Sequence, residues 1–152
     1  TTTNVINMMK FLLKAKSPYD ILEETDGNKA IHRRFSEIDK KYTKLLNKAK
    51  ATAFQNENDK ILFFQYSGDT SMSSDLSNEL MYLFPDKIIL ILRLNGLTAN
   101  VSARGKNVRE LILKAIEGIE GSRAGGHENA VGGQIKVEDL EKFKENLEKL
   151  VG

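Results

Sequence analysis

The segment GSRAGGHENAVGG, residues 121–133, separates a helical pattern from a strand pattern and differs in composition from the rest of the chain. Its paired glycines permit positive φ angles and let a ligand approach backbone N–H groups. N–H groups directed at one point form a concavity suited to an anion such as phosphate. We expect residues 128–130 to form a short helical turn that favours the same anion. The composition alone is equally compatible with a plain glycine-rich connector.

The patterns around this segment predict alternating helices and strands. Before it, residues 97–104 alternate as a strand, with Ser102 and Arg104 on one face. A helix is then expected from a cap at Asn107 to about residue 120. After it come a short strand at 133–137 and an amphipathic helix to the end of the chain.

Further towards the N-terminus, residues 60–66 predict a buried strand and residues 73–84 a helix that Pro85 stops. The continuous apolar run 87–94 is expected to be the central strand, covered on both faces. Asn95-Gly96 predicts a hairpin into the strand that carries Arg104. The order β-α-β-β-α-loop-β-α indicates an α/β fold with a mixed β-sheet flanked by helices.

The N-terminal third is predicted to be helical. Apolar spacing predicts a helix over residues 4–16, and Ser17-Pro18 predicts the start of a short helix ending near Gly27. Residues 28–54 lack glycine and proline, and their narrow apolar seam predicts one long helix. Such a helix serves as a strut between domains, packs on a core, or forms a coiled-coil contact. We therefore expect a long connecting helix and a short helical N-terminal segment before the sheet.

The composition argues against catalysis by this chain alone. It has 152 residues, no cysteine, two histidines and a net charge of only +2. Metal-dependent phosphodiester cleavage needs clustered aspartates and histidines, but no D-x-D cluster occurs and His32 lies far along the chain from His127. The net charge restricts any nucleic-acid site to a local patch. No apolar run is long enough to span a membrane, and we expect a cytoplasmic protein without membrane partners.

Two separated motifs carry a family resemblance. Residues 125–132 read G-G-H-x-x-A-x-G, and residues 102–104 read S-x-R. Over roughly residues 55–151 the chain resembles the DHH-associated domain, the C-terminal substrate-binding domain of DHH-family phosphoesterases such as RecJ-type single-strand exonucleases. Residues 27–55 resemble the long helix that joins the two domains of these enzymes. Residues 1–26 resemble the last helices of their catalytic domain.

The resemblance implies a substrate-binding role beside a separate catalytic domain. The D-H-H triplet is missing here, so no cofactor is expected on this chain, and Mn²⁺ or Mg²⁺ is expected in a preceding DHH domain. Arg104 would bond a phosphate or terminal nucleotide, the glycines would supply backbone donors, and His127 would hold a nonbridging oxygen or polarise the scissile phosphate. Arg123 or Lys106 would guide the nucleic-acid strand electrostatically. The expected phosphate-binding residues are Ser102, Arg104, Arg123, Gly125, Gly126, His127 and Asn129.

The expected partners are single-stranded DNA or RNA and the DHH catalytic domain, and the resemblance also allows replication or repair proteins. Three alternatives stay open: a noncatalytic RecJ-related DNA-binding subunit of an archaeal replication helicase complex, a DHH-family small-nucleotide phosphodiesterase, and an editing-associated domain like that of alanyl-tRNA synthetases. The S-x-R strand and the long helix favour the RecJ-like exonuclease over the last of these.

Overall fold

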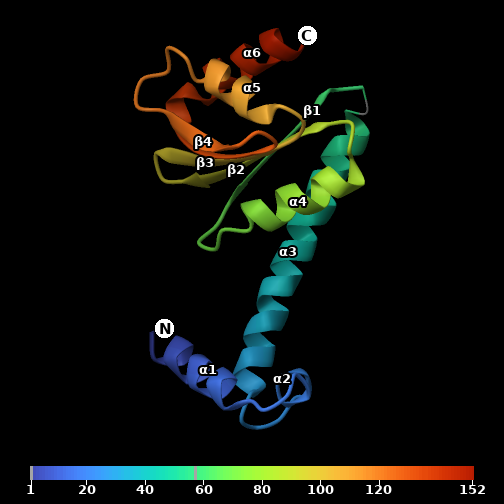
Figure 1. Cartoon of the computed structure of the whole chain (residues 1–152), viewed down its shortest axis with the longest axis vertical. Helices are drawn as coiled ribbons and strands as arrows, with labels where there is room; N and C mark the ends of the chain where they lie inside the picture. The colour runs from blue at the N-terminus through green and yellow to red at the C-terminus, as the bar shows by residue number, and fades with distance from the viewer. Residues whose placement is uncertain (1, 57) are drawn as a thin grey trace. The chain divides into compact units, whose positions relative to one another are not determined.

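The computed structural model describes residues 2–56 and 58–152 of the chain (Figure 1). The chain divides into two compact units, Thr1–Lys44 and Leu45–Gly152. Helix α3, Lys29–Gln55, contributes its first part to one unit and its last part to the other. The predicted long helix is thus confirmed within a residue of its expected ends.

The N-terminal unit contains α1, Thr2–Lys14, and the short α2, Tyr19–Leu22. α2 has Pro18 at its N-cap and no side-chain cap hydrogen bond there. The Asp20 carboxylate accepts backbone hydrogen bonds from Lys16 at 2.8 Å and from Ser17 at 3.2 Å. These hydrogen bonds favour the ionised carboxylate and lower the pKa of Asp20.

A buried asparagine joins α2 to α3. Asn28 is fully buried, and its amide nitrogen donates to backbone carbonyls that include those of Asp20 and Glu23, at 3.1 and 2.8 Å. Its side-chain oxygen accepts from the Thr25 backbone N–H at 2.7 Å. These bonds satisfy an amide that would be costly to bury alone, and they explain why α2 ends at Leu22 rather than near Gly27.

The C-terminal unit is a five-stranded mixed sheet in the order β1-β2-β3-β5-β4. β1 is parallel to β2, and every other pairing is antiparallel. The predicted α/β class and mixed sheet are confirmed. The elements are β1 (Ile61–Ser67), α4 (Ser73–Leu83), β2 (Ile88–Asn95), β3 (Thr98–Arg104), α5 (Val108–Ala115), β4 (Arg123–His127), β5 (Ala130–Lys136), the 3₁₀ turn η1 (Val137–Asp139) and α6 (Leu140–Val151).

The two faces of this sheet are covered differently (Figure 1). α5 and α6 cover one face, here called the core face, where the largest group of buried apolar side chains lies. α4 packs against β2 and β3 on the opposite face, here called the α4 face. Alternation along β3 sends Val101 and Ala103 into the core and leaves Ser102 and Arg104 on the α4 face, as predicted. On the α4 face, the helix α4 contacts β2 and β3.

Three expectations about the sheet were wrong in detail. The segment 121–133 is not a loop, because residues 123–127 form the strand β4 and β5 starts at Ala130. The helix before it ends at Ala115 rather than near residue 120. β3, not β2, is the central strand, although β2 is buried on both faces as expected. The predicted hairpin between β2 and β3 is confirmed, and it turns at residues 96–97 with Gly96 at φ +60°.

Candidate functional site

The G-G-H-x-x-A-x-G residues form a β-hairpin rather than a loop. β4 and β5 pair antiparallel and turn at residues 128–129, and β5 pairs with β3 on its other side. Residues directly paired across antiparallel strands place their side chains on the same face. Three rows of residues therefore cross the α4 face. They are Arg104, Ala130 and His127 (row 1), Ser102, Gly132 and Gly125 (row 2), and Asn100, Gln134 and Arg123 (row 3).

The four glycines of the hairpin fall into two classes. A Cβ at Gly126, where φ is +147°, would collide with the Ala130 carbonyl oxygen, and a Cβ at Gly133 would lie 2.8 Å from the Arg123 carbonyl oxygen. These two glycines are required for the strands to pair. Gly125 and Gly132 are paired in row 2, and a Cβ at either would meet no atom of the described residues within 4 Å. At these two positions of row 2 the backbone is exposed without a side chain, although the fold would accept one there.

Arg104 is held at the end of row 1 by neutral partners. Its Nε donates to Asn78 Oδ1 at 2.8 Å, and its Nη1 donates to the Ala103 carbonyl at 2.9 Å. Partial burial lowers the pKa of Arg104, but the guanidinium remains charged at neutral pH. Within residues 2–56 and 58–152, the structure gives Arg104 no carboxylate partner within salt-bridge distance. Its guanidinium is thus held in position by neutral groups, and its positive charge is not paired with a carboxylate.

Ser102 has a different place from the one expected of a ligand donor. Its side chain is only 6% exposed, and its Oγ lies 3.0 Å from Ser77 Oγ of α4. The same Oγ accepts a hydrogen bond from Arg104 Nη1 at 3.3 Å. Ser102 therefore connects α4 to Arg104 and helps to orient the guanidinium. A direct contact between Ser102 and a ligand stays a prediction.

His127 stands at the other end of row 1. It is exposed and pairs with Ala130, which in turn pairs with Arg104. Two strand spacings of about 4.8 Å place the His127 and Arg104 backbones ~10 Å apart. Ala130 between them carries a small side chain, and the neighbouring row 2 has none at Gly125 and Gly132. An anion bound over this surface would thus meet donors from both sides.

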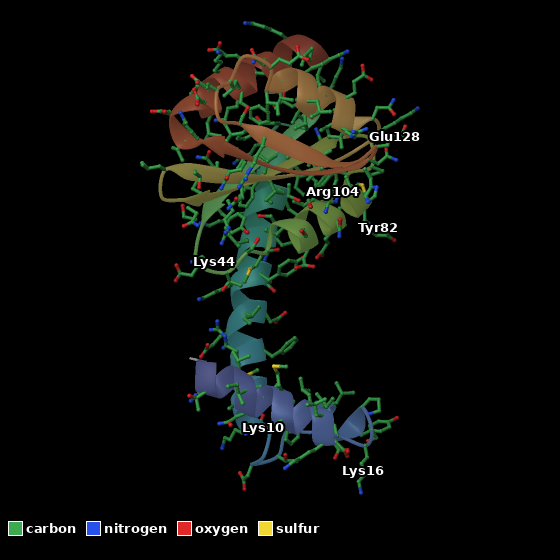
Figure 2. The ribbon with its side chains drawn as sticks, turned by 60° about the vertical axis from the view of Figure 1, so that its left-hand side comes forward. Lys10, Lys16, Lys44, Tyr82, Arg104 and Glu128 are labelled. Atoms are coloured by element: carbon green, nitrogen blue, oxygen red, sulfur yellow. The ribbon has the colours of Figure 1, made fainter. Side chains whose placement is uncertain are left out.

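Asn129 acts within the protein. Its side-chain oxygen accepts the Asn107 backbone N–H at 3.0 Å, and its carbonyl accepts the Gly105 N–H at 3.2 Å. The Arg109 N–H donates to the Glu128 carbonyl at 3.0 Å. The hairpin turn therefore accepts hydrogen bonds from backbone N–H groups at the start of α5. The predicted side-chain cap at Asn107 does not form. The helical turn expected at residues 128–130 is absent. In Figure 2 the labels of Arg104 and Glu128 mark this end of the sheet.

Row 3 contains Arg123 and two amides that sequence reasoning missed. Arg123 Nη2 donates to Gln134 Oε1 at 2.9 Å, and Gln134 Nε2 donates to Asn100 Oδ1 at 3.4 Å. Asn100 could have been found from its spacing, because it is two residues before Ser102 and four before Arg104 on one strand. Gln134 and the α4 residues Ser77 and Asn78 reach the site only through tertiary packing.

The remaining candidates lie apart from these rows. Lys106 is exposed in the segment after β3. In the N-terminal unit, His32 Nε2 lies 2.8 Å from the Ile21 carbonyl, so its ring has a structural partner. In the described part of the chain, no group of three or more His, Cys, Asp or Glu side chains could hold a metal ion. No described helix is long and apolar enough to cross a membrane.

Comparison with solved structures finds similar folds at low identity. RecJ from Thermus thermophilus in complex with Mg²⁺ matches 98% of this chain with a TM-score of 0.60 and 11% identity. The pGpG-specific phosphodiesterase PggH from Vibrio cholerae matches 97% with a TM-score of 0.53 and 16% identity. The C-Ala domain of Aquifex aeolicus alanyl-tRNA synthetase matches 60% with a TM-score of 0.50 and 18% identity.

The chain spans 23% of the Thermus RecJ and 49% of PggH, but it covers 91% of the C-Ala domain. A search of curated proteins gives no significant match. The model of the DHHA1 domain family matches residues 56–152, which include β3, the glycine hairpin and all three rows. From this match over more than half of its length, the chain belongs to the DHHA1 domain family.

Proposed function

We propose that this chain is the substrate-binding C-terminal part of a RecJ-like phosphoesterase and that rows 1 and 2 bind a phosphate of single-stranded nucleic acid. A DHH domain with Mn²⁺ or Mg²⁺ would supply the hydrolytic chemistry in the whole protein. The described residues hold no metal-binding cluster, so the proposal for this chain concerns binding and orientation.

The observation that carries the proposal is the pair of open glycines. Glycine in a strand costs about 0.5–1 kcal/mol relative to alanine, and nothing in the described chain demands glycine at positions 125 and 132. Both lie in the row beside Arg104 and His127. A ligand that approaches the backbone there provides the physical reason for tolerating that cost.

The chemistry of row 1 suits a phosphate. A guanidinium binds phosphate oxygens through charge-assisted hydrogen bonds, and Asn78 and Ser102 hold that of Arg104 by accepting from it. A histidine adds a second donor from the opposite side. These groups contact the sugar-phosphate backbone rather than base edges, so row 1 by itself would bind strands of any sequence.

The test is binding of fluorescein-labelled oligothymidylate, with and without a 5′ phosphate, followed by anisotropy at several salt concentrations. Arg104→Ala should weaken binding by at least about tenfold, because a charged hydrogen bond contributes about 1.5–3 kcal/mol. The slope of log K against log salt should fall by about 0.7 for one lost phosphate contact. Arg104→Lys should recover part of the slope but not the whole affinity, since lysine lacks the planar fork.

Lys114→Ala is the matched control. Lys114 carries the same charge, lies on α5, which covers the core face, and pairs with Glu110 at 2.8 Å. Its removal should change the affinity by less than about twofold. Equal losses in Arg104→Ala and Lys114→Ala would show that binding depends on net charge alone. No loss in Arg104→Ala and His127→Ala would place the site elsewhere.

A further inference from the structure

The side chains of row 3 are hydrogen-bonded in series, from Arg123 to Gln134 to Asn100. Arg123 determines which amide atom of each neighbour donates and which accepts. A guanidinium only donates hydrogen bonds, so the Gln134 atom that faces Arg123 must be its oxygen. The Gln134 nitrogen then faces Asn100, and Asn100 presents its oxygen in return. The side-chain oxygens of Gln134 and Asn100 thus each accept a hydrogen bond from another member of row 3.

The donors that remain point to a ligand rich in acceptors. Only one N–H of Gln134 is used inside the row. Among the described residues, both N–H groups of Asn100 and the other N–H groups of Arg123 remain for further partners. Arg93 of β2 pairs with Asn100, so an arginine stands at either end of this polar row. Phosphate oxygens and the carbonyl and ring-nitrogen acceptors of nucleobases match such a surface.

The separation between row 3 and row 1 determines what can occupy both. Asn100 and Arg104 are four residues apart on β3, which corresponds to ~13 Å at about 3.3 Å per residue. Row 2 lies between these two rows, and it has no side chains at Gly132 and Gly125. A single phosphate cannot reach both rows. A stacked strand rises about 3.4 Å per nucleotide, so about four nucleotides span the distance, and fewer do so when the strand is extended.

We propose that Asn100, Gln134 and Arg123 form a second subsite that binds the same strand at least one nucleotide away from the phosphate on Arg104 and His127. The ligand of the α4 face is then an oligonucleotide of two to four nucleotides or a longer strand, rather than a mononucleotide. This inference rests on the proposed function of rows 1 and 2. It adds a minimum length for the ligand. It also adds three residues that contact only ligands long enough to reach them and that do not bind the phosphate on Arg104.

The experiment is competition of 5′-phosphorylated thymidylates of one, two, four and eight nucleotides against labelled oligothymidylate. The proteins are the parent chain, Gln134→Ala, Arg123→Gln, Arg104→Ala and the control Lys114→Ala. Affinity of the parent should rise with length up to about four nucleotides. Gln134→Ala and Arg123→Gln should each reduce tetranucleotide affinity on the order of three- to tenfold and leave the mononucleotide unchanged.

Arg104→Ala should weaken binding at every length, and this separates the two proposals. If Arg104→Ala weakens all ligands while the row 3 variants behave as the parent, the second subsite is refuted and the phosphate site stands. If the row 3 variants reduce mononucleotide affinity as much as tetranucleotide affinity, the length requirement is refuted. If the parent binds no ligand or Arg104→Ala has no effect, the proposed function itself fails. Far-UV circular dichroism and thermal unfolding of each variant check that the substitutions leave the fold intact.

Discussion

Alanine at Gly125 and alanine at Gly126 are expected to act in opposite ways, although the residues are neighbours in one strand. Gly125 has a negative φ, and a methyl group there meets no described atom within 4 Å. Gly126 has φ +147°, and a methyl group there collides with the Ala130 carbonyl oxygen and lies 3.1 Å from the Val131 Cα. Gly125→Ala therefore tests ligand approach, and Gly126→Ala tests strand pairing.

The magnitudes follow from backbone physics. Replacing a strand glycine by alanine without strain stabilises the fold by about 0.4–1 kcal/mol, because the unfolded chain loses freedom. Strain of the kind expected at Gly126 costs at least about 2 kcal/mol. For a chain of this size, 1 kcal/mol shifts Tm by about 2–4 °C. Gly125→Ala should thus raise Tm by up to about 4 °C, and Gly126→Ala should lower it by at least about 4 °C.

Binding should separate from stability at Gly125. A methyl group there stands in row 2 and removes the approach to the backbone between Arg104 and His127, so oligothymidylate affinity should fall at least about tenfold while Tm is unchanged or higher. Gly132→Ala should behave in the same way. Thermal unfolding and anisotropy on the same samples measure both quantities. Parent-like affinity in Gly125→Ala and Gly132→Ala would refute the argument that a ligand lies over these glycines.

Three further substitutions test the supports of the fold. Asn129→Ala removes the acceptor of the Asn107 N–H and should lower the free energy of unfolding by about 1 kcal/mol in denaturant titration, and unchanged stability would contradict its role at the hairpin turn. Asn28→Ala leaves buried carbonyls and an N–H unpaired and should cost about 2–3 kcal/mol in the N-terminal unit, seen as faster amide exchange there. The folded pKa of Asp20 is lowered, so its contribution to stability is complete above its ordinary pKa of 3.8 and is lost as pH falls through the folded value. The stability difference between the parent and Asp20→Asn should therefore vanish at low pH, and a difference that persists there would contradict the linkage.

Most elements of the fold could be predicted from local pattern. The apolar runs that became β1 and β2 are of strand length, and the uninterrupted residues of α3 repeat a helical spacing over many turns. β4 was missed because arginine, alanine and two glycines have little strand preference. It forms because β5 offers backbone partners and because Gly126 and Gly133 allow close approach. Its existence depends on tertiary pairing rather than on its own residues.

The long helix shows a similar limit. Its seam of apolar residues, which includes Phe35 and Ala49, predicted one packed edge, and Ala49 is indeed buried. Phe35, in the same seam, is 67% exposed in the structure. Periodicity indicates which residues share a helix face, but it does not indicate where along the helix a neighbour lies against that face.

The sequence by itself determined the α/β class, the family motifs and the common face of Ser102 and Arg104, because these follow from periodicity and from residue types at fixed spacing. Only the tertiary structure showed that Arg104 and His127 share a row, that two glycines are open while two are required, and that Asn100 and Gln134 join Arg123. These relations depend on strand register, which backbone pairing between distant segments establishes. The sequence carries the chemical groups of the site, and the register of β3, β5 and β4 places them on one surface.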